Sequence, residues 1–256
     1  MVSGSKRRRE LARQRYERQQ ARRTATWQRK QRRNRIAAIA LAGVLVISGA
    51  IVVAQRVISD NRTTLAAGRC VYTASGTPAS DVGLPEFDPE VAAQPYTATL
   101  KTNRGDITFA ALTDNAPCAT YSFRYLAENN YYDQSSCPRV VNSPGFSLLQ
   151  CGTPTGSAAD TPGYQFPDEN LTDATYPAGA IAMANTGQPN SNGSQFFIVY
   201  QDSEELTANY TPFGTVTSGL AVAAKVGEAG NDGSNPAGGG NPKLPITITD
   251  VVISPA

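Results

Sequence analysis

The run 182–200 contains side chains that could recognise another molecule. Asn192-Gly193 tolerates positive φ and predicts a tight turn, and the aromatic and β-branched residues that follow it predict a strand. Because side chains alternate along a strand, Gln195 and Phe197 share one face while Phe196 lies on the other. One phenylalanine can therefore pack in the core while the other stands beside an amide on the opposite face.

The composition excludes several common kinds of catalysis. The chain has no histidine, which removes Ser-His and Cys-His nucleophile pairs. No glycine-rich loop precedes a helix in the phosphate-binding pattern. The acidic pairs Asp168-Glu169 and Glu204-Glu205 are typical of solvated loops, which disfavours glycoside hydrolysis by paired carboxylates. What remains is a reaction that needs no nucleophile, metal or cofactor.

The elements that must position these residues are mostly short strands. A hairpin is predicted for residues 96–102 and 106–112. Pro117 opens a predicted helix that ends near Asn129-Asn130, and Ser218 caps a second predicted helix. Many short strands with two isolated helices indicate an all-β barrel or sandwich. The remaining strands are predicted at 137–141, 146–151, 179–184, 195–200, 212–216 and 245–253.

The segment Met183-Ala184-Asn185, followed by the segment 192–198, resembles the signature of cyclophilin-type peptidyl-prolyl isomerases. The resemblance covers residues 96–256 and implies a closed eight-stranded antiparallel barrel with two capping helices, its active surface on the outside. With the apolar segment described below, it suggests a membrane-anchored bacterial form. Flanking segments that agree in order and spacing are Ala116-Pro117, Tyr131–Asp133, Arg139–Val141, Gln150–Gly152, Pro154–Gly156, Pro162–Phe166, Asp168-Glu169 and Phe213-Gly214.

The resemblance implies a reaction that the composition permits, namely rotation about a prolyl amide bond. Partial double-bond character gives this bond a barrier of ~18–20 kcal/mol, and rotation localises the nitrogen lone pair. A fixed donor aimed at that nitrogen binds the transition state selectively. Arg139 falls at the family's catalytic arginine position and is permanently charged. The expected substrates are proline-containing segments of extracytoplasmic client proteins.

A substrate site is also implied by the resemblance. Phe197 and Leu206 match apolar positions that hold the proline ring, and Leu148 stands where the family usually has methionine. Four further residues match positions that hold the substrate backbone: Gln150, Ala184, Asn185 and Gln195.

The chain departs from the family pattern around this site. Ten residues separate Arg139 from Gln150, so the expected pocket phenylalanine is either displaced to Phe146 or lost to Ser147. Tyr210 replaces a pocket histidine, and its ring could close the pocket. Other departures are Cys137-Pro138 before the arginine, an interruption of the glycine-rich loop at 157–160, an inserted Gln188, and Glu205 in place of a tryptophan associated with cyclosporin binding.

These departures have two consequences for function. Glu205 predicts weak cyclosporin binding. The substituted pocket positions also support an alternative hypothesis, in which the barrel is a catalytically weak or silent module that binds proline-containing segments as a chaperone or scaffold. Under either hypothesis, no cofactor and no nucleic-acid partner are expected.

Charge divides the chain near residue 35. Residues 1–35 hold 14 Lys and Arg and two Glu, a net of +12, whereas the whole chain has a net of +2, which leaves −10 for residues 36–256. Residues 36–54 contain nineteen residues without a charge, against the ~20 that cross a bilayer, and predict a single transmembrane helix. A cleaved signal peptide is the alternative, although the charged and apolar parts are both unusually long for one.

The expected topology follows from the basic segment. Lys and Arg stay on the cytoplasmic side, so residues 1–35 are expected to form a cytoplasmic tail of a single-pass cell-membrane protein, with residues 96–256 as its extracytoplasmic domain. Residues 55–95, rich in Ser, Thr, Ala and Pro, are predicted to be the linker. The tail is expected to lie against anionic headgroups; nucleic-acid binding is the alternative, without a recognisable motif.

Four cysteines follow the apolar segment: Cys70, Cys118, Cys137 and Cys151. Irregular spacing and the lack of histidine disfavour a zinc site, and an oxidising compartment favours two disulfides. If Arg139 and Gln150 lie on paired strands, Cys137 and Cys151 flank them and can bridge, which leaves Cys70 to tie the linker to Cys118. Strict alternation places Cys137 and Cys151 on opposite faces, so the other two pairings stay open.

Overall fold

The structure is a computed structural model that describes residues 70–256. The predicted basic tail, the predicted transmembrane helix at 36–54 and the first part of the predicted linker lie outside the described residues. No helix formed by residues 70–256 is long and apolar enough to cross a membrane.

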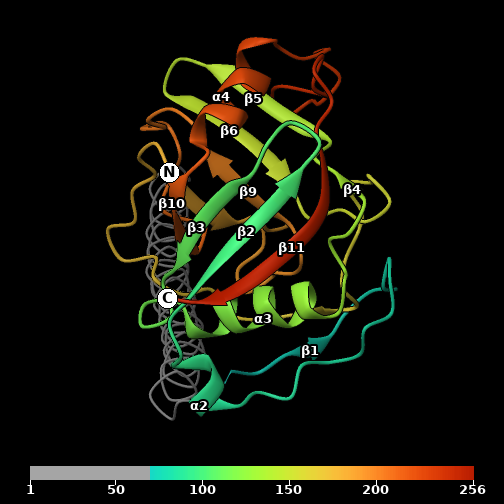
Figure 1. The fold of residues 1–256 in the computed structure, drawn as a ribbon, viewed down its shortest axis with the longest axis vertical. Helices are drawn as coiled ribbons and strands as arrows, with labels where there is room; N and C mark the ends of the chain where they lie inside the picture. The colour runs from blue at the N-terminus through green and yellow to red at the C-terminus, as the bar shows by residue number, and fades with distance from the viewer. Residues whose placement is uncertain (1–69) are drawn as a thin grey trace, which may run out of the picture. The chain divides into compact units, whose positions relative to one another are not determined.

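One antiparallel sheet of nine strands dominates the described part of the chain (Figure 1). The predicted strands are confirmed, with their ends shifted by a few residues, and a short strand at Ser135–Ser136 joins them. In spatial order the strands are β4 (Ser135–Ser136), β11 (Thr247–Pro255), β2 (Tyr96–Thr102), β3 (Ile107–Ala111), β10 (Pro212–Ser218), β8 (Ala180–Met183), β9 (Phe196–Val199), β6 (Phe146–Cys151) and β5 (Arg139–Ser143).

The predicted closed barrel of eight strands is wrong, because the sheet stays open between β4 and β5. These two edge strands are consecutive segments joined by Cys137-Pro138, and proline has no N–H to donate to a ladder. We call this opening between β4 and β5 the seam, and other segments hydrogen-bond to the backbone groups that line it. Cys137 donates its N–H to the Ile246 carbonyl (3.1 Å), and Val140 exchanges two backbone hydrogen bonds with Gly240 (2.9 and 3.1 Å).

Two helices pack against the sheet, as predicted. Helix α3 (Pro117–Glu128) lies across one end of β2 and β11, and α4 (Leu220–Glu228) lies near β5 and β6 at the other end (Figure 1). The predicted cap at Ser218 is wrong: Ser218 ends β10, and the cap is Gly219 with φ 81°. A side chain at Gly219 would meet the Asp106 carbonyl oxygen at 2.0 Å, so glycine is required at this turn.

Residues 70–95 form an arm that packs on the domain, although the sequence assigns them to a linker. Strand β1 (Thr73–Ala74) pairs with β7 (Tyr164–Gln165). Helix α2 (Pro89–Ala92) contacts α3, and Figure 1 shows β1 and α2 on the side of the domain where α3 lies. The ring of Tyr72 lies 5.5 Å from Tyr164 and 5.6 Å from Phe166. These aromatic contacts, with a disulfide at Cys70, explain why a segment of linker composition is held in place.

The two faces of the sheet bury two apolar clusters. The inner face, with Leu149, Phe196 and Ile198, packs against α3 and the rings of Phe109 and Phe123. A smaller group, which we call the outer cluster, covers the opposite face. Its members are Val141, Leu148, Tyr176, Ala180, Ala182, Phe197 and Val199, with Phe146, Ala174, Ala184, Leu206 and Tyr210 packed against them.

Both expected disulfides are present. Cys70 is bonded to Cys118, and Cys137 is bonded to Cys151. Cys151 lies on the inner face opposite Gln150, as alternation requires. Cys137 lies between β4 and β5 rather than within a strand, so alternation does not fix its direction and its side chain is buried beside Cys151.

A buried carboxylate caps helix α3 from a distant loop. The cap residue Ala116 has no side-chain acceptor, and Glu169 instead accepts from the N–H groups of Cys118 (3.0 Å) and Ala119 (2.8 Å). Burial raises the pKa of Glu169 to about 7, against the two backbone hydrogen bonds, which lower it. Glu169 therefore links the stability of the fold to pH.

Replacing Glu169 by alanine is expected to lower the free energy of unfolding by about 2 kcal/mol, because two N–H groups at the buried start of α3 lose their acceptor. The wild-type carboxyl also binds a proton more tightly when folded, since its pKa is raised from 4.5 to about 7. The stabilisation that this bound proton gives the folded state is therefore fully present below pH 4.5. It is lost, by at most about 3 kcal/mol of the free energy of unfolding, as pH rises through about 7.

Urea unfolding of the wild type and of Glu169→Gln across this pH range measures the effect. As pH rises, the free energy of unfolding of the wild type is expected to fall relative to that of Glu169→Gln, because only the wild type carries the titrating carboxyl. A difference that stays constant with pH would contradict the raised pKa.

Candidate functional site

Neighbouring strands bring a row of residues together on the outer face of the sheet. Arg139 on β5 pairs with Gln150 on β6. Gln150 pairs in turn with Phe197 on β9, and Phe197 pairs with Ala182 on β8. Directly opposed residues in an antiparallel sheet present their side chains on the same face. Residues from four strands are therefore neighbours on this surface.

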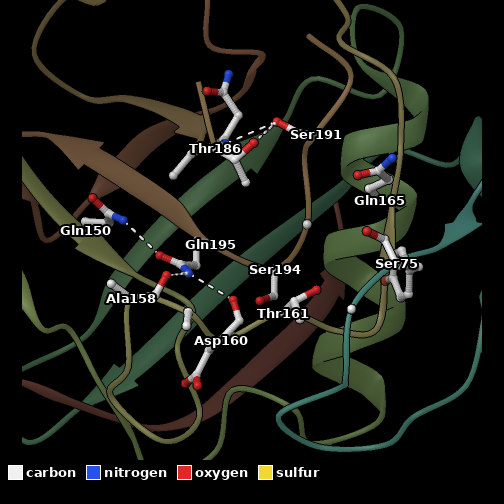
Figure 2. Close-up of a pocket in the computed structure, with 16 residues that line it drawn as sticks. Ser75, Gln150, Ala158, Asp160, Thr161, Gln165, Thr186, Ser191, Ser194 and Gln195 are labelled. Carbon is white, nitrogen blue, oxygen red and sulfur yellow. Dashed lines mark hydrogen bonds between the residues drawn. The ribbon is translucent and has the colours of Figure 1, made fainter. Parts of the chain in front are cut away.

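Hydrogen bonds connect Arg139 and Gln150 to a third polar side chain, Gln195, which directly precedes β9. We call Arg139, Gln150 and Gln195 the relay. Arg139 Nη1 donates to Gln150 Oε1 (3.0 Å), and Gln150 Nε2 donates to Gln195 Oε1 (2.9 Å). Gln195 Nε2 then donates to the carbonyl oxygens of Ala158 (3.0 Å) and Asp160 (2.9 Å). Figure 2 shows Gln150 bonded to Gln195, and Gln195 bonded in turn to both carbonyls. Each amide is therefore oriented by its neighbour.

The other side of the Arg139 guanidinium faces a loop. Nε donates to the Gly238 carbonyl (3.1 Å) and Nη2 to the Ala237 carbonyl (3.0 Å). The Arg139 Cζ atom lies 5.9 Å from the centre of the Phe146 ring, within cation–π range. Burial lowers the pKa of Arg139, while Tyr210 acts in the opposite direction. These bonds use three of the five guanidinium N–H donors, so two are left for a substrate.

The position of Phe146 answers one question that the sequence leaves open. Phe146, Leu148 and Gln150 share the outer face of β6, whereas Ser147 is buried on the other face and donates to the Ser143 carbonyl (3.1 Å). Phe146 is therefore the aromatic residue that reaches the predicted site.

Apolar side chains lie beside the relay in the outer cluster. Leu148 and Phe197 are buried there, and Leu206 and Tyr210 are partly buried against them. The Tyr210 ring meets the Phe197 ring edge-on, with centroids 5.3 Å apart and an interplanar angle of 85°. Phe197 is 3% exposed in this arrangement, so Tyr210 covers the ring expected to receive proline.

Tyr176 is a site residue that the sequence analysis missed. Its hydroxyl donates to the Tyr210 carbonyl (2.8 Å) and accepts from the Tyr210 N–H (3.0 Å). Its ring lies 6.2 Å from both Phe197 and Tyr210. The available signal was a single aromatic residue before Pro177 in a segment without periodicity, which does not reveal a contact 34 residues away.

A pocket of about 350 Å³ adjoins the relay (Figure 2). Four of the predicted site residues line it: Gln150, Ala184, Asn185 and Gln195. Ser75 and Gly76 of the arm line it too, and Figure 2 shows Ser75 across the pocket from Gln150. Small uncharged side chains form most of the wall, which suits an uncharged side chain of a bound peptide.

Two predicted residues also hold local structure. Ala184 donates its N–H to the Gln195 carbonyl (2.9 Å), which joins the two sides of the pocket. Asn185 donates to the Asn209 carbonyl (2.8 Å) and accepts from the Gly187 N–H (3.0 Å). The Asn185 side chain thus anchors the segment that carries Tyr210.

The predicted site residues do not all line one hollow. Leu206 lines a separate one of about 430 Å³, together with Tyr176 and Glu204. Arg139, Phe197 and Leu148 line neither of these two hollows and lie on the outer face of the sheet.

The predicted tight turn with positive φ at Asn192-Gly193 is wrong. Asn192 bridges to Phe166, and its Nδ2 donates to the carbonyl of Pro167 (3.0 Å) and to the carboxylate of Asp168 (2.9 Å). Asn190, two residues earlier, has the positive φ of 60°. The Asn192 side chain binds the loop at Pro167 and Asp168, and Asn192 does not adopt a positive φ.

One cluster of potential metal ligands occurs within residues 70–256: Cys70, Cys118 and Glu169. The two sulfur atoms are bonded to each other and Glu169 caps α3, so this cluster does not present thiolate ligands.

A family model decides the affiliation of this fold and site. The model described as cyclophilin type peptidyl-prolyl cis-trans isomerase/CLD matches residues 97–253. The chain belongs to this cyclophilin family. Its match to the family model includes the whole outer face that carries the relay.

Individual cyclophilins are similar to the same region. The probable peptidyl-prolyl cis-trans isomerase B of Mycobacterium tuberculosis is 39% identical over 168 residues, which are 60% of this chain and 53% of that protein. The chain thus spans about half the length of this relative. The probable isomerase A of Mycobacterium leprae is 34% identical over 179 residues, 63% of this chain and 93% of that protein.

A solved cyclophilin has a similar fold. The crystal structure of a cyclophilin-type isomerase from Cryptosporidium parvum matches with a TM-score of 0.56 and 30% identity, over 63% of this chain and 99% of that chain. A second structure of the same protein, in the presence of the dipeptide Ala-Pro, matches with a TM-score of 0.55 and the same identity.

Proposed function

We propose that this cyclophilin is a peptidyl-prolyl cis-trans isomerase in which Arg139 donates a hydrogen bond to the prolyl nitrogen in the twisted transition state. One observation carries the proposal: a charged guanidinium, held by three hydrogen bonds and with two N–H donors unused, lies beside an apolar cluster. Family membership supports the same reaction.

The chemistry requires a donor that is fixed before the reaction begins. In the planar amide the nitrogen lone pair is conjugated with the carbonyl, so it accepts hydrogen bonds poorly. Rotation ends the conjugation and creates an acceptor. A guanidinium already oriented by Gln150 and two carbonyl groups meets this acceptor without reorganising. The donor therefore stabilises the transition state more than the ground state, which is the condition for catalysis.

The outer cluster supplies the second requirement, a surface for the proline ring. Phe197, Leu148 and Leu206 provide its apolar groups, and the proline ring can reach Phe197 only if Tyr210, which contacts it edge-on, moves aside. The pocket lined by Gln195 and Ala184 accepts the residues that precede proline. The Ala-Pro dipeptide used with the Cryptosporidium protein supports a proline-containing substrate.

The direct test is the cis-to-trans rate of an X-Pro peptide with and without the purified protein. We expect the rate to rise in proportion to protein concentration and to reach saturation with peptide. Uncatalysed isomerisation takes tens of seconds, so a spectroscopic assay that follows the peptide over this time distinguishes the catalysed rate from the uncatalysed rate. No acceleration at micromolar protein would refute the proposal.

A second candidate function rests on the cover over Phe197. Tyr210, which stands where the family has a histidine, lies on this ring and leaves it 3% exposed, so the substituted pocket favours a module that holds proline-containing segments without catalysing their isomerisation. This binding module predicts saturable binding of the same peptide with no change in its isomerisation rate. A calorimetric titration beside the rate assay separates the two functions.

We further propose that the isomerase acts outside the cytoplasm on secreted or envelope proteins, held by a membrane helix at 36–54 and with residues 1–35 inside. The uncharged segment 36–54, the basic segment before it and the two disulfides support this location. Protease treatment of intact cells is expected to degrade residues 96–256 and to spare residues 1–35. Protection of the domain would contradict the location.

We expect cyclosporin to bind weakly and expect Glu205→Trp to tighten binding about fivefold, as an added aromatic contact contributes about 1 kcal/mol. Glu205 lies at the edge of the outer face, where its N–H donates to the Gly145 carbonyl (3.0 Å). Fluorescence titration of both proteins measures the change, with Glu204→Trp as the neighbouring control. Equal affinities for the wild type and Glu205→Trp would show that position 205 does not limit binding.

A further inference from the structure

Two loops meet the relay at its two ends. The first, residues 229–243, supplies the Ala237 and Gly238 carbonyls to Arg139. The second, residues 152–161, supplies the carbonyls of Ala158 and Asp160 to Gln195. Neither loop has regular secondary structure over these carbonyls, so something else must fix their positions.

A carboxylate closes the first loop. Asp232 Oδ1 accepts from the N–H groups of Ser234 (3.0 Å) and Asn241 (2.9 Å), and Oδ2 accepts from Asn241 Nδ2 (2.9 Å). The Asp232 N–H also donates to the Asn241 carbonyl (3.1 Å). Hydrogen bonds from the side chains of Ser234 and Asn241, with those from their N–H groups, hold the pKa of Asp232 well below its usual range. We call the bonds between Asp232 and Asn241 the clasp. The two ends of the loop are thereby tied together.

The closed loop is fixed against the strand that carries Arg139. Gly240, next to the clasp, exchanges two hydrogen bonds with Val140, the neighbour of Arg139. A side chain at Gly239 would meet the Val140 carbonyl at 2.2 Å, and one at Gly240 would meet Asp232 Oδ1 at 2.2 Å. The two glycines have no side chain to clash, so the loop can approach the Val140 backbone closely, and the Asp232 carboxylate holds the loop in this position. The Ala237 and Gly238 carbonyls are thus placed against the guanidinium.

A second carboxylate closes the other loop in the same manner. Asp160 Oδ2 accepts from the Thr155 N–H (2.8 Å), and Oδ1 accepts from the Thr155 hydroxyl (2.7 Å). The Asp160 backbone carbonyl faces the opposite way, toward Gln195 Nε2. Figure 2 shows the Asp160 carboxylate directed away from Gln195. One residue therefore both closes the loop and supplies an acceptor to the relay.

The direction of the relay depends on these acceptors. Two carbonyls bind Gln195 Nε2, so its Oε1 must face Gln150, and Gln150 Oε1 must then face Arg139. If the carbonyls moved away, either amide could turn over and present NH₂ to a neighbouring donor. A glutamine turned in this way would repel the guanidinium rather than orient it.

We propose that Asp232 and Asp160 are positioning residues, which fix the two ends of the relay and thereby the orientation of Arg139. This inference rests on the proposed function. Asp232 acts on the guanidinium through the Ala237 and Gly238 carbonyls, and Asp160 acts on it through Gln195 and Gln150.

The full chain with Asp232→Ala is the first test. We expect kcat for an X-Pro peptide to fall about tenfold with KM nearly unchanged, since a 1 Å misplacement of a catalytic group can cost roughly 100-fold. Asp160→Ala is expected to lower kcat and also to raise KM, because Gln195 lines the pocket. Asp88→Ala is the matched control: Asp88 likewise accepts two backbone N–H groups in a loop, but at α2.

Two further measurements separate positioning from a general loss of stability. The double variant Asp232→Asn/Asn241→Asp exchanges the donor and the acceptor of the clasp and is expected to recover most of the lost kcat. The NMR resonance of Arg139 Nε–H, which is bonded to Gly238, is expected to shift and to exchange faster with water in Asp232→Ala, and to return in the double variant.

The outcomes distinguish this inference from the proposed function. Activity that is unchanged by Arg139→Ala overturns both. A loss of activity in Arg139→Ala, together with an unchanged kcat and an unmoved Arg139 resonance in Asp232→Ala, overturns the positioning role alone. A kcat that falls equally in Asp232→Ala and Asp88→Ala overturns it as well, since the effect would then not pass through the relay.

Discussion

Arg139→Ala is expected to lower kcat/KM for X-Pro isomerisation by roughly 100-fold to 1,000-fold, the usual cost of removing one donor that stabilises transition-state charge. Arg139 is the one cationic side chain of the relay, and its guanidinium lies beside Phe146, which packs against the outer cluster. Peptide affinity should change little, because the planar amide nitrogen accepts hydrogen bonds poorly. The isomerisation assay with a binding titration measures both quantities.

Two variants control for charge and for surface position. Arg139→Lys keeps the charge but loses the planar fork that bonds Gln150, Ala237 and Gly238 together, so most of the activity should still be lost. Arg124→Ala removes an arginine on α3, where Arg124 Nε pairs with Glu128 at 2.7 Å, and should leave the rate unchanged. Full activity in Arg139→Ala would refute the arginine mechanism.

Much of the fold follows from periodicity in the sequence. Alternation along β6, and along β9 with the residue before it, predicts that Gln150 shares a face with Leu148, and Gln195 with Phe197. In the structure Gln150 lies beside Phe197 and bonds to Gln195 on the outer face. These patterns are local, and a buried sheet enforces them because a shift of one residue would expose the whole inner face. The alternating residues of the site were therefore predictable without coordinates.

The loops were not predictable, because their paths depend on bonds that periodicity does not report. Asp232 and Asn241 are nine residues apart in a Gly-rich segment, and nothing local indicates that their side chains meet. The same holds for Tyr176 and Tyr210. The open seam beside β5 depends likewise on Val140 pairing with Gly240 rather than with a strand.

The arm shows how composition can mislead. Ser, Thr and Pro predict a flexible linker, yet residues 70–95 are held by a disulfide and by rings such as Tyr72. A short segment needs few contacts to be ordered when its end is covalently fixed, since the bond removes much of the entropy that ordering would cost. As a result, the arm contributes Ser75 to the pocket beside the relay.

Removing the Cys137–Cys151 disulfide is the second change with a large expected effect. In the double variant Cys137→Ala/Cys151→Ala, the free energy of unfolding should fall by about 3 kcal/mol, the loop-closure value for a bridge of this length. The cysteines are 14 residues apart and stand beside Arg139 and Gln150. Because the bond fixes the seam where β5 begins, we also expect kcat to fall several-fold while the protein is still folded.

The double variant Cys70→Ala/Cys118→Ala is the matched control, since it removes a bridge that spans 48 residues at the arm. Loop closure alone predicts a larger loss there, about 4 kcal/mol, but no displacement of Arg139. Urea unfolding is therefore expected to show the larger loss of stability in the Cys70/Cys118 variant. The isomerisation rate, measured where both variants are folded, is expected to show the larger loss of kcat in the Cys137/Cys151 variant. If the arm variant lost more kcat than the seam variant, the relay would depend on global stability rather than on the local bond beside Arg139.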